Sequence, residues 1–210
     1  MIKILIADDH AILRQGLRHI ISETTDMAVE GEAGDAAQAL RLAREGRFDV
    51  VVLDVTLPDR NGLDALKLIK KEKPKLPVLM LSMHPEEHYA LRALRAGASG
   101  YLNKQSAPAQ LVTAIRRVAS GRKYVSSTLA EELADTLSGD GNRQPHEALS
   151  DREFQTLRLI ASGRTLTEIA DELSLSVKTV SVYRARILEK MKLKNNAELT
   201  HYALKNGLVE

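Results

Sequence analysis

The sequence predicts a two-domain protein: an α/β domain with a doubly wound, five-stranded parallel sheet, followed by an all-α domain that contains a helix-turn-helix. Short apolar runs alternate with amphipathic segments over about the first 120 residues, as in α/β proteins. From Ser150 onward, apolar residues recur only at helical spacing. Between the two halves, residues 138–146 have the Gly, Pro and polar content of a linker.

Five apolar runs in the first half are expected to form strands. The clearest is the aliphatic run at residues 50–53, because an uninterrupted apolar strand is typical of a parallel sheet covered by helices on both faces. Asp54 ends this run, and a carboxylate there is costly unless it emerges at the carboxyl end of the strand. The expected strands are 2–7, 27–33, 50–54, 76–82 and 99–103.

A helix is expected after each strand, because apolar residues recur there three or four positions apart. Asp35 is expected to begin one helix, and Gly46, Gly97 and Gly121 are each expected to end one. Residues 58–62, Pro-Asp-Arg-Asn-Gly, have turn chemistry. The expected helices are 10–23, 35–45, 63–73, 86–96 and 107–120.

The second half is expected to be entirely helical, with capping signatures at three helix starts. The signatures are Ser150 with Glu153, Thr165 with Glu168 and Asn195 with Glu198. The expected helices are 151–162, 166–173, 177–191 and 196–205. A short helix, a tight turn and a longer helix form a helix-turn-helix. We expect domains at 1–121 and 148–210, joined by a linker at 122–147 that includes a short helix before residue 138.

The composition excludes several classes of protein. The 210 residues include no cysteine, which excludes a disulfide framework, a cysteine-based zinc site and a thiol nucleophile. No segment approaches the roughly 20 apolar residues that a membrane helix needs. We therefore expect a cytoplasmic protein with no membrane partner. The net charge of +2 is too small to indicate a partner by itself.

Polar side chains follow four of the expected strands. Asp8 and Asp9 come directly after the first strand, Asp54 ends the third, and Ser82 and Lys104 close the fourth and fifth. These groups are expected to converge, because the carboxyl ends of parallel strands share one edge of the sheet. Converging carboxylates repel one another unless a cation neutralises them, and Mg²⁺ suits an oxygen-ligand site that handles phosphate. Asp9 and Asp54 are expected as direct ligands, and Asp8 as a direct or water-mediated ligand.

This set of residues predicts phosphoryl chemistry at Asp54. With Mg²⁺ present, an Asp54 oxygen attacks an incoming phosphoryl group to form an acyl phosphate. Lys104 balances the added charge, and the Ser82 hydroxyl donates to a phosphoryl oxygen. A single acid of this kind is more often a helix cap or a solvated charge, but five matched positions favour a site. No chemical role is expected of three histidines that lack evident metal-ligand companions: His10, His84 and His88.

The polar residues at the strand ends resemble the signature of the receiver domain of two-component response regulators. The signature consists of Asp8, Asp9, Asp54, Ser82, Tyr101 and Lys104. The resemblance implies a flavodoxin-like fold with Asp54 as the phosphoacceptor. It also implies that Mg²⁺ is surrounded by Asp8, Asp9, Asp54 and the main-chain carbonyl of Thr56. Ser82 and Tyr101 become the pair of switch residues.

Basic residues gather in the helix expected at 177–191 and just after it. The apolar stripe of this helix is expected to face the core, and it consists of Val180, Tyr183, Ile187, Leu188 and Met191. Between Lys178 and Lys194, six basic residues accompany a single acid, Glu189. A helix fits the major groove of DNA, so this helix is the candidate reader, with flanking basic residues on the phosphates. On charge alone, a solvated basic face is an equal alternative.

Nearly all of residues 148–208 resemble the LuxR-type DNA-binding domain of the NarL/FixJ family. The resemblance rests on residues 149–153, Gly163, 167–170 and 175–181. It implies that Lys178 and Thr179 lie near DNA phosphates and that Ser181, Val182 and Ala185 face the bases, where thymine methyl groups suit Val182 and Ala185. The residues expected to contact DNA are Lys178, Thr179, Ser181, Val182, Ala185, Arg186 and Lys190.

Together these features predict a phosphorylation-dependent transcriptional regulator rather than an enzyme. A sensor histidine kinase is expected to phosphorylate Asp54, and a homodimer is expected to bind double-stranded promoter DNA through residues 177–191. Two alternatives stay open: a DNA-binding regulator with a vestigial receiver, and a Mg²⁺-dependent phosphohydrolase with Asp54 as nucleophile. The phosphohydrolase is disfavoured because Thr56, rather than a second acid, lies two residues after Asp54.

Overall fold

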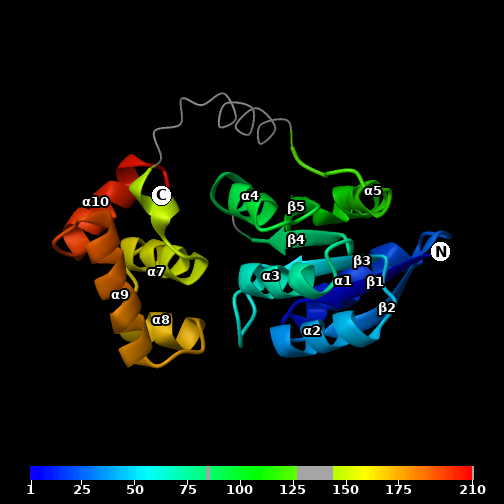
Figure 1. The fold of residues 1–210 in the computed structure, drawn as a ribbon, viewed down its shortest axis with the longest axis horizontal. Helices are drawn as coiled ribbons and strands as arrows, with labels where there is room; N and C mark the ends of the chain where they lie inside the picture. Colours follow the sequence, from blue (N-terminus) through cyan, green and yellow to red (C-terminus); the bar gives the residue numbers. More distant parts are fainter. Residues whose placement is uncertain (84–85, 127–143, 210) are drawn as a thin grey trace. The chain divides into compact units, whose positions relative to one another are not determined.

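A computed structural model describes residues 1–83, 86–126 and 144–209 of the chain (Figure 1). The chain forms two compact units, Met1–Asp140 and Gly141–Glu210, which are described separately below. The short helix expected before residue 138 lies outside the described residues.

The first unit contains a parallel sheet with strand order β2-β1-β3-β4-β5 (Figure 1). The strands are β1 (Ile2–Ala7), β2 (Met27–Ala33), β3 (Val50–Asp54), β4 (Val78–Ser82) and β5 (Gly100–Asn103). This order is that of the flavodoxin-like doubly wound fold, as the sequence predicts. Every residue of β3 and β4 is buried. β4 begins two residues later than expected, at Val78, because Pro77 has no N–H to donate to the ladder.

Helices cover both faces of the sheet. They are α1 (Ala11–Ser22), α2 (Ala36–Glu45), α3 (Gly62–Glu72), α4 (Glu86–Arg95) and α5 (Ala107–Ala119). α1 contacts α5, whereas α2 contacts α3 and α3 contacts α4. On the side of α1 and α5, Leu17, Ile21, Leu111 and Ile115 pack into one buried cluster with inward residues of the strands. Alternation along β5 directs Tyr101 to the face opposite Leu102.

The register of the sheet brings the strand ends to a common edge. Asp54 is opposite Leu81, and Ser82 is opposite Asn103. Ala7, the last residue of β1, is opposite Leu53. The residues that follow β1, β3, β4 and β5 therefore meet at one edge, which is where open α/β sheets bind ligands.

The second unit is helical. Its elements are the 3₁₀ turn η1 (Pro145–Ala148) and the helices α7 (Asp151–Ala161), α8 (Leu166–Glu172), α9 (Val177–Met191) and α10 (Asn196–Lys205). The expected capping boxes at Ser150 and Thr165 are both present. Asn195 caps α10 through the Glu198 N–H, but the Glu198 carboxylate accepts from the Lys194 N–H instead of completing the box. α8, a turn and α9 form the predicted helix-turn-helix.

Among the described helices of both units, none is long and apolar enough to cross a lipid bilayer.

Candidate functional site

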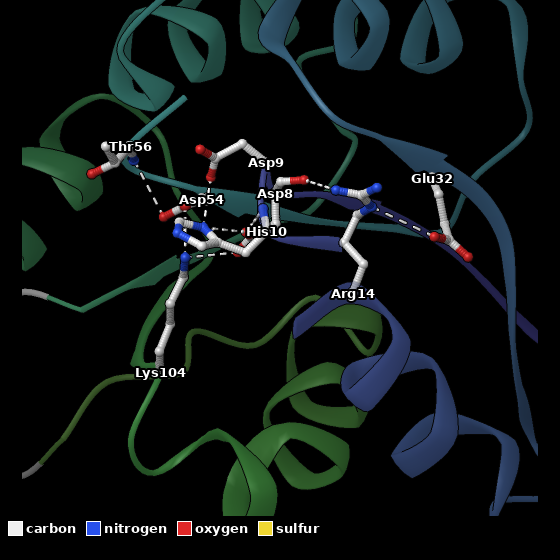
Figure 2. Close-up of polar contacts among 8 residues, drawn as sticks. All are labelled: Asp8, Asp9, His10, Arg14, Glu32, Asp54, Thr56 and Lys104. Carbon is white, nitrogen blue, oxygen red and sulfur yellow. Dashed lines mark hydrogen bonds and ion pairs between the residues drawn. The ribbon is translucent and has the colours of Figure 1, made fainter. Parts of the chain in front are cut away.

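A lysine bridges two buried carboxylates at the carboxyl edge of the sheet (Figure 2). Asp8 follows β1, Asp54 ends β3, and Lys104 follows β5. The Lys104 Nζ atom lies 2.7 Å from Asp8 Oδ2 and 2.7 Å from Asp54 Oδ2. All three side chains are buried, so the carboxylates and the ammonium interact with little screening by water. Three residues that are far apart in the sequence thus form one charged cluster, as the strand ends predict.

Burial strongly perturbs the ionisation of this cluster. Burial, reinforced by the neighbouring Asp8 carboxylate, raises the pKa of Asp54 to about 6, although Lys104 and the Thr56 N–H oppose this shift. The Thr56 N–H donates to Asp54 Oδ1 over 3.2 Å. Burial alone would lower the pKa of Lys104, but the attraction of Asp54 and Asp8 raises it above its ordinary value. Lys104 is therefore a cation at neutral pH, where Asp54 is ionised.

Asp9 and His10 form the accessible side of the cluster (Figure 2). The Asp9 side chain is 34% exposed, and its Oδ1 atom lies 2.7 Å from His10 Nδ1. The same ring nitrogen lies 3.2 Å from Asp8 Oδ1. The expectation that His10 lacks metal-ligand companions is wrong, because its ring lies against the two acids that precede it and its ligand atom is grouped with those of Asp8, Asp9 and Asp54. The signal of this arrangement in the sequence is the position of His10 directly after Asp8 and Asp9.

The composition of this cluster fits a hard divalent cation. Asp8, Asp9, His10 and Asp54 each offer one ligand atom, and these atoms lie within 4.8 Å of one another. Three carboxylates and one Lys104 ammonium leave an excess of negative charge. Carboxylate oxygens are the ligands that Mg²⁺ prefers in proteins, and one carboxylate is open to solvent. The acidic pocket that the sequence predicts at this edge of the sheet is therefore present.

The loop between β3 and α3 contributes residues that the sequence predicts only as turn formers. A Cβ atom at Gly62 would lie 1.8 Å from the main-chain oxygen of Asp54, so only glycine fits there. The Gly62 N–H donates to the Val55 carbonyl over 2.8 Å. Asn61 is buried, and its side chain accepts from the Leu63 N–H over 2.8 Å. The Asn-Gly pair at a strand-to-helix turn is the only signal of this role in the sequence.

Arg14 supports the site from α1 (Figure 2). Its Nη1 atom donates to the main-chain oxygen of Asp8 over 2.5 Å, and its Nε atom lies 3.6 Å from the Glu32 carboxylate on β2. These contacts join the turn after β1 to the neighbouring strand. The helical spacing around Arg14 gives no indication of this role, because it depends on two tertiary contacts.

The two expected switch residues occupy different environments. Ser82 is buried at the end of β4, at the same edge as Lys104, whose N–H donates to the Ser82 carbonyl over 2.8 Å. Tyr101 is fully buried on β5, opposite Met80. The structure thus brings Ser82 to the edge that carries the charged cluster and places the Tyr101 ring in the interior.

The second unit presents the expected reading face of α9. The residues of this face that are exposed are Lys178, Ser181, Val182, Ala185 and Arg186. Thr179 is half-buried, and both its N–H and its hydroxyl contact the Ser176 hydroxyl that caps the helix. Val180, Ile187 and Met191 face the core, as predicted. The helix thus has one buried and one accessible side.

Lys190 differs from the other residues expected to contact DNA. Its Nζ atom lies 2.6 Å from the carboxylate of Glu153, which is buried in the capping box of α7. Burial raises the pKa of Glu153, but the hydrogen bonds from Lys190 and Ser150 outweigh it and hold the pKa below the ordinary value. Lys190 therefore links α9 to the start of α7, a contact that helical spacing does not reveal.

Comparison with known protein families identifies the class of protein. Residues 4–116 match the response regulator receiver domain, and residues 147–203 match the luxR family of bacterial regulatory proteins. The chain therefore belongs to the NarL/FixJ-type response regulators, which join a receiver to a LuxR-type DNA-binding domain. Its function is phosphorylation-dependent regulation of transcription, as the sequence predicts.

Individual relatives are similar over nearly the whole chain. The response regulator UvrY of Escherichia coli K12 is 36% identical over 99% of this chain and 96% of its own length. The response regulator GacA of Pseudomonas aeruginosa is 35% identical over 100% of this chain and 99% of its own. Among solved structures, the chain is similar to RcsB from Salmonella enterica serovar Typhimurium, bound to promoter rprA in the presence of the phosphomimetic BeF₃⁻. The two chains are 27% identical and superpose with a TM-score of 0.65, and the match covers 96% of this chain and 98% of RcsB.

Proposed function

We propose that Asp54 is the phosphoacceptor, that a sensor histidine kinase is the donor, and that the phosphoryl group controls DNA binding by α9. The observation that carries this proposal is the bridge from Lys104 to the Asp8 and Asp54 carboxylates. In the transfer, an Asp54 oxygen forms a bond to phosphorus while the bond from phosphorus to the donor nitrogen breaks. The products are an acyl phosphate and the free histidine of the kinase.

Asp8, Asp9, Asp54 and the main-chain carbonyl of Thr56 would hold Mg²⁺. The bound ion would neutralise the carboxylates and the phosphoryl oxygens, which are otherwise mutually repulsive. The described protein groups orient this arrangement. Arg14 holds the main chain of Asp8, and the Thr56 N–H holds one oxygen of Asp54.

Lys104 and Ser82 respond to the new charge. The Lys104 ammonium, which bridges two carboxylates, pairs with a phosphoryl oxygen in the modified protein, and the Ser82 hydroxyl donates to another. Their movement alters the end of β4 and the start of the segment after β5. Tyr101 on β5 is the second switch residue, as the resemblance to the receiver signature implies. The modification shifts the receiver between two states through these differential contacts.

The exposed face of α9 would enter the major groove of promoter DNA. Lys178, Thr179 and Arg186 contact phosphates, while Ser181, Val182 and Ala185 face the bases. Lys190 is assigned a contact with the phosphate backbone of the DNA at the edge of the interface, although its ammonium also pairs with the Glu153 carboxylate. The chain would bind paired half-sites as a homodimer. This is supported by the structure of two RcsB dimers bound to two parallel DNAs. That RcsB chain is 28% identical to this chain, with a TM-score of 0.59 and 96% of each chain covered.

We assign residues 1–121 to the receiver, 122–147 to the linker and 148–210 to the DNA-binding domain. The chain works in the cytoplasm, where a bacterial regulator meets the chromosome. Its own chemistry is confined to forming and slowly hydrolysing one acyl phosphate, so it is not an enzyme acting on a separate substrate.

Phosphoryl transfer is tested with acetyl phosphate and Mg²⁺, followed by intact-protein mass spectrometry. Wild type is expected to gain one phosphoryl group, and Asp54→Asn none. Equal labelling of both proteins would contradict the assignment of Asp54. Continuous release of phosphate from phosphate esters at a rate that Asp54→Asn abolishes would favour the phosphohydrolase.

A further inference from the structure

Asp59 lies in the loop between β3 and α3, but its carboxylate binds a different element. Its Oδ1 atom accepts from the Ala36 N–H over 2.7 Å, and its Oδ2 atom accepts from the Ala37 N–H over 2.9 Å. Ala36 and Ala37 open α2, where the backbone N–H groups have no acceptor within the helix and carry partial positive charge. Both oxygens of Asp59 thus hold the start of α2.

α2 already has a cap from its own segment. The Asp35 side chain accepts from the Gln38 N–H over 2.7 Å, and the Gln38 side chain accepts from the Gly34 N–H over 2.8 Å. This local pair resembles a capping box and is sufficient to begin a helix. The contacts of Asp59 therefore do more than begin α2, because they tie the loop after β3 to it.

The rest of the loop has contacts within itself and one bond to β4, in which the Val55 N–H donates to the Leu81 carbonyl over 3.0 Å. The Gly62 N–H binds the Val55 carbonyl, Thr56 pairs with Asn61, and Asn61 caps α3. β3 pairs with β1, so the start of the loop is fixed in the sheet beside the strand that precedes Asp8 and Asp9. α2 also packs against β1, so the bonds from Asp59 to α2 hold the later part of the loop, residues 56–59, on the side of the same strand.

We propose that Asp59 is a positioning residue for the phosphoryl-transfer site. It fixes the loop that carries Thr56 against α2 and β1, and it thereby sets the Thr56 carbonyl relative to the carboxylates of Asp8 and Asp9. Hydrogen bonds that orient metal ligands commonly control metal affinity without touching the metal. This inference rests on the proposed function, because it assigns Thr56 to the Mg²⁺ site.

The chain offers a matched control in Asp35. Asp59→Ala and Asp35→Ala each remove one carboxylate at the start of α2, but only Asp59 belongs to the loop. Two measurements on the full chain separate them: the Mg²⁺ dissociation constant by calorimetry, and amide hydrogen exchange of residues 55–61 without metal. Asp59→Ala is expected to weaken Mg²⁺ binding about tenfold and to speed exchange in the loop. Asp35→Ala is expected to leave both unchanged while lowering the melting temperature.

Asp59→Asn provides a graded variant, because its amide oxygen still accepts one N–H but its charge is gone. An effect midway between wild type and Asp59→Ala supports positioning. If Asp59→Ala fails to fold, Asp59→Asn is compared with wild type and Asp35→Ala instead, and weaker Mg²⁺ binding with faster loop exchange in Asp59→Asn alone supports positioning. Unchanged Mg²⁺ affinity and loop exchange in Asp59→Ala, or equal changes in Asp35→Ala, would overturn the proposal and leave Asp59 as a helix cap. If wild type binds no Mg²⁺, the proposed function fails, and the metal-free exchange comparison still decides whether Asp59 fixes the loop.

Discussion

At the scale of single residues, stability and chemistry oppose each other at Asp54. The ordinary pKa of this carboxyl is 3.8, and the folded protein raises it to about 6. Between these pH values the folded chain keeps a proton that the unfolded chain has lost, so stability falls as pH rises through this window. The penalty is complete once the folded carboxyl has also lost its proton. The ionised carboxylate that phosphoryl transfer requires is thus a destabilising group in the metal-free protein.

Asp54→Asn should therefore stabilise the metal-free protein at neutral and higher pH. We expect a gain on the order of 1–3 kcal/mol at pH 8 that disappears near pH 4, because the wild-type carboxyl is then protonated. Urea unfolding of both proteins in the presence of a chelator measures this difference in the free energy of unfolding. A variant that is equally stable or less stable than wild type at pH 8 would contradict the cost of burying Asp54.

Gly62→Ala should disturb the site through sterics alone. The added Cβ would overlap the main-chain oxygen of Asp54, so we expect a loss of about 1–3 kcal/mol and slower labelling by acetyl phosphate. Gly16→Ala on α1 is the control, because a Cβ there meets no atom within 4 Å. The control should be neutral or stabilising by up to about 1 kcal/mol. Equal behaviour of the two variants would refute the close approach of Gly62.

The sequence predicts those residues of the charged cluster that have a clear signal in their own sequence context. Asp8 and Asp54 are acids at the ends of apolar strands, and a parallel sheet brings strand ends together whatever the loops do. Arg14 and Asp59 are different, because their roles depend on which backbone groups the fold places beside them. Many surface arginines and loop aspartates share their sequence context.

At the scale of elements, helix boundaries follow from local chemistry. The capping boxes at Ser150 and Thr165 form within four residues, so the starts of α7 and α8 were predictable. The Glu198 carboxylate departs from this pattern because the Lys194 N–H competes for it. The link between Lys190 and Glu153 joins two helices across 37 positions and has no local signal.

Lys190→Ala should destabilise the helical unit. It leaves the buried Glu153 carboxylate without its cation, and we expect a loss of about 1–3 kcal/mol in urea unfolding. The folded protein lowers the pKa of Glu153 below the ordinary 4.5, so the stabilisation is present above that value and is lost as pH falls through the lowered pKa. A variant as stable as wild type at pH 7 would show that the pair contributes nothing.

Unlike Lys190→Ala, Lys178→Ala should weaken DNA binding without destabilising the helical unit. Lys178 is exposed in the first turn of α9, where a cation is unfavourable to the helix dipole, so stability should hold or rise slightly. DNA binding should weaken across sequences, and the slope of log affinity against log salt should fall by about 1, because one phosphate contact is lost. Fluorescence anisotropy at several salt concentrations measures both. An unaltered slope would remove Lys178 from the phosphate contacts.

At the scale of the whole molecule, each unit has its own sequence pattern and core, and this is why both were predictable from sequence. Regulation depends on communication between them, which neither pattern encodes. A phosphoryl group on Asp54 shifts DNA affinity only to the extent that it interacts differently with two states of the receiver. In the mechanism proposed above, Lys104 and Ser82 are the groups at the sheet edge that make this difference.

The affinity of the full chain for its DNA, with and without the phosphoryl group, tests the central claim most directly. Genomic fragments recovered with phosphorylated wild type supply the probe, and acetyl phosphate with Mg²⁺ supplies the modification. We predict that phosphorylated wild type binds about 5- to 150-fold more tightly than unmodified protein, the usual range of allosteric coupling, and that Asp54→Asn does not respond. Equal affinity of phosphorylated and unmodified wild type would contradict the account and leave a DNA-binding protein with a vestigial receiver.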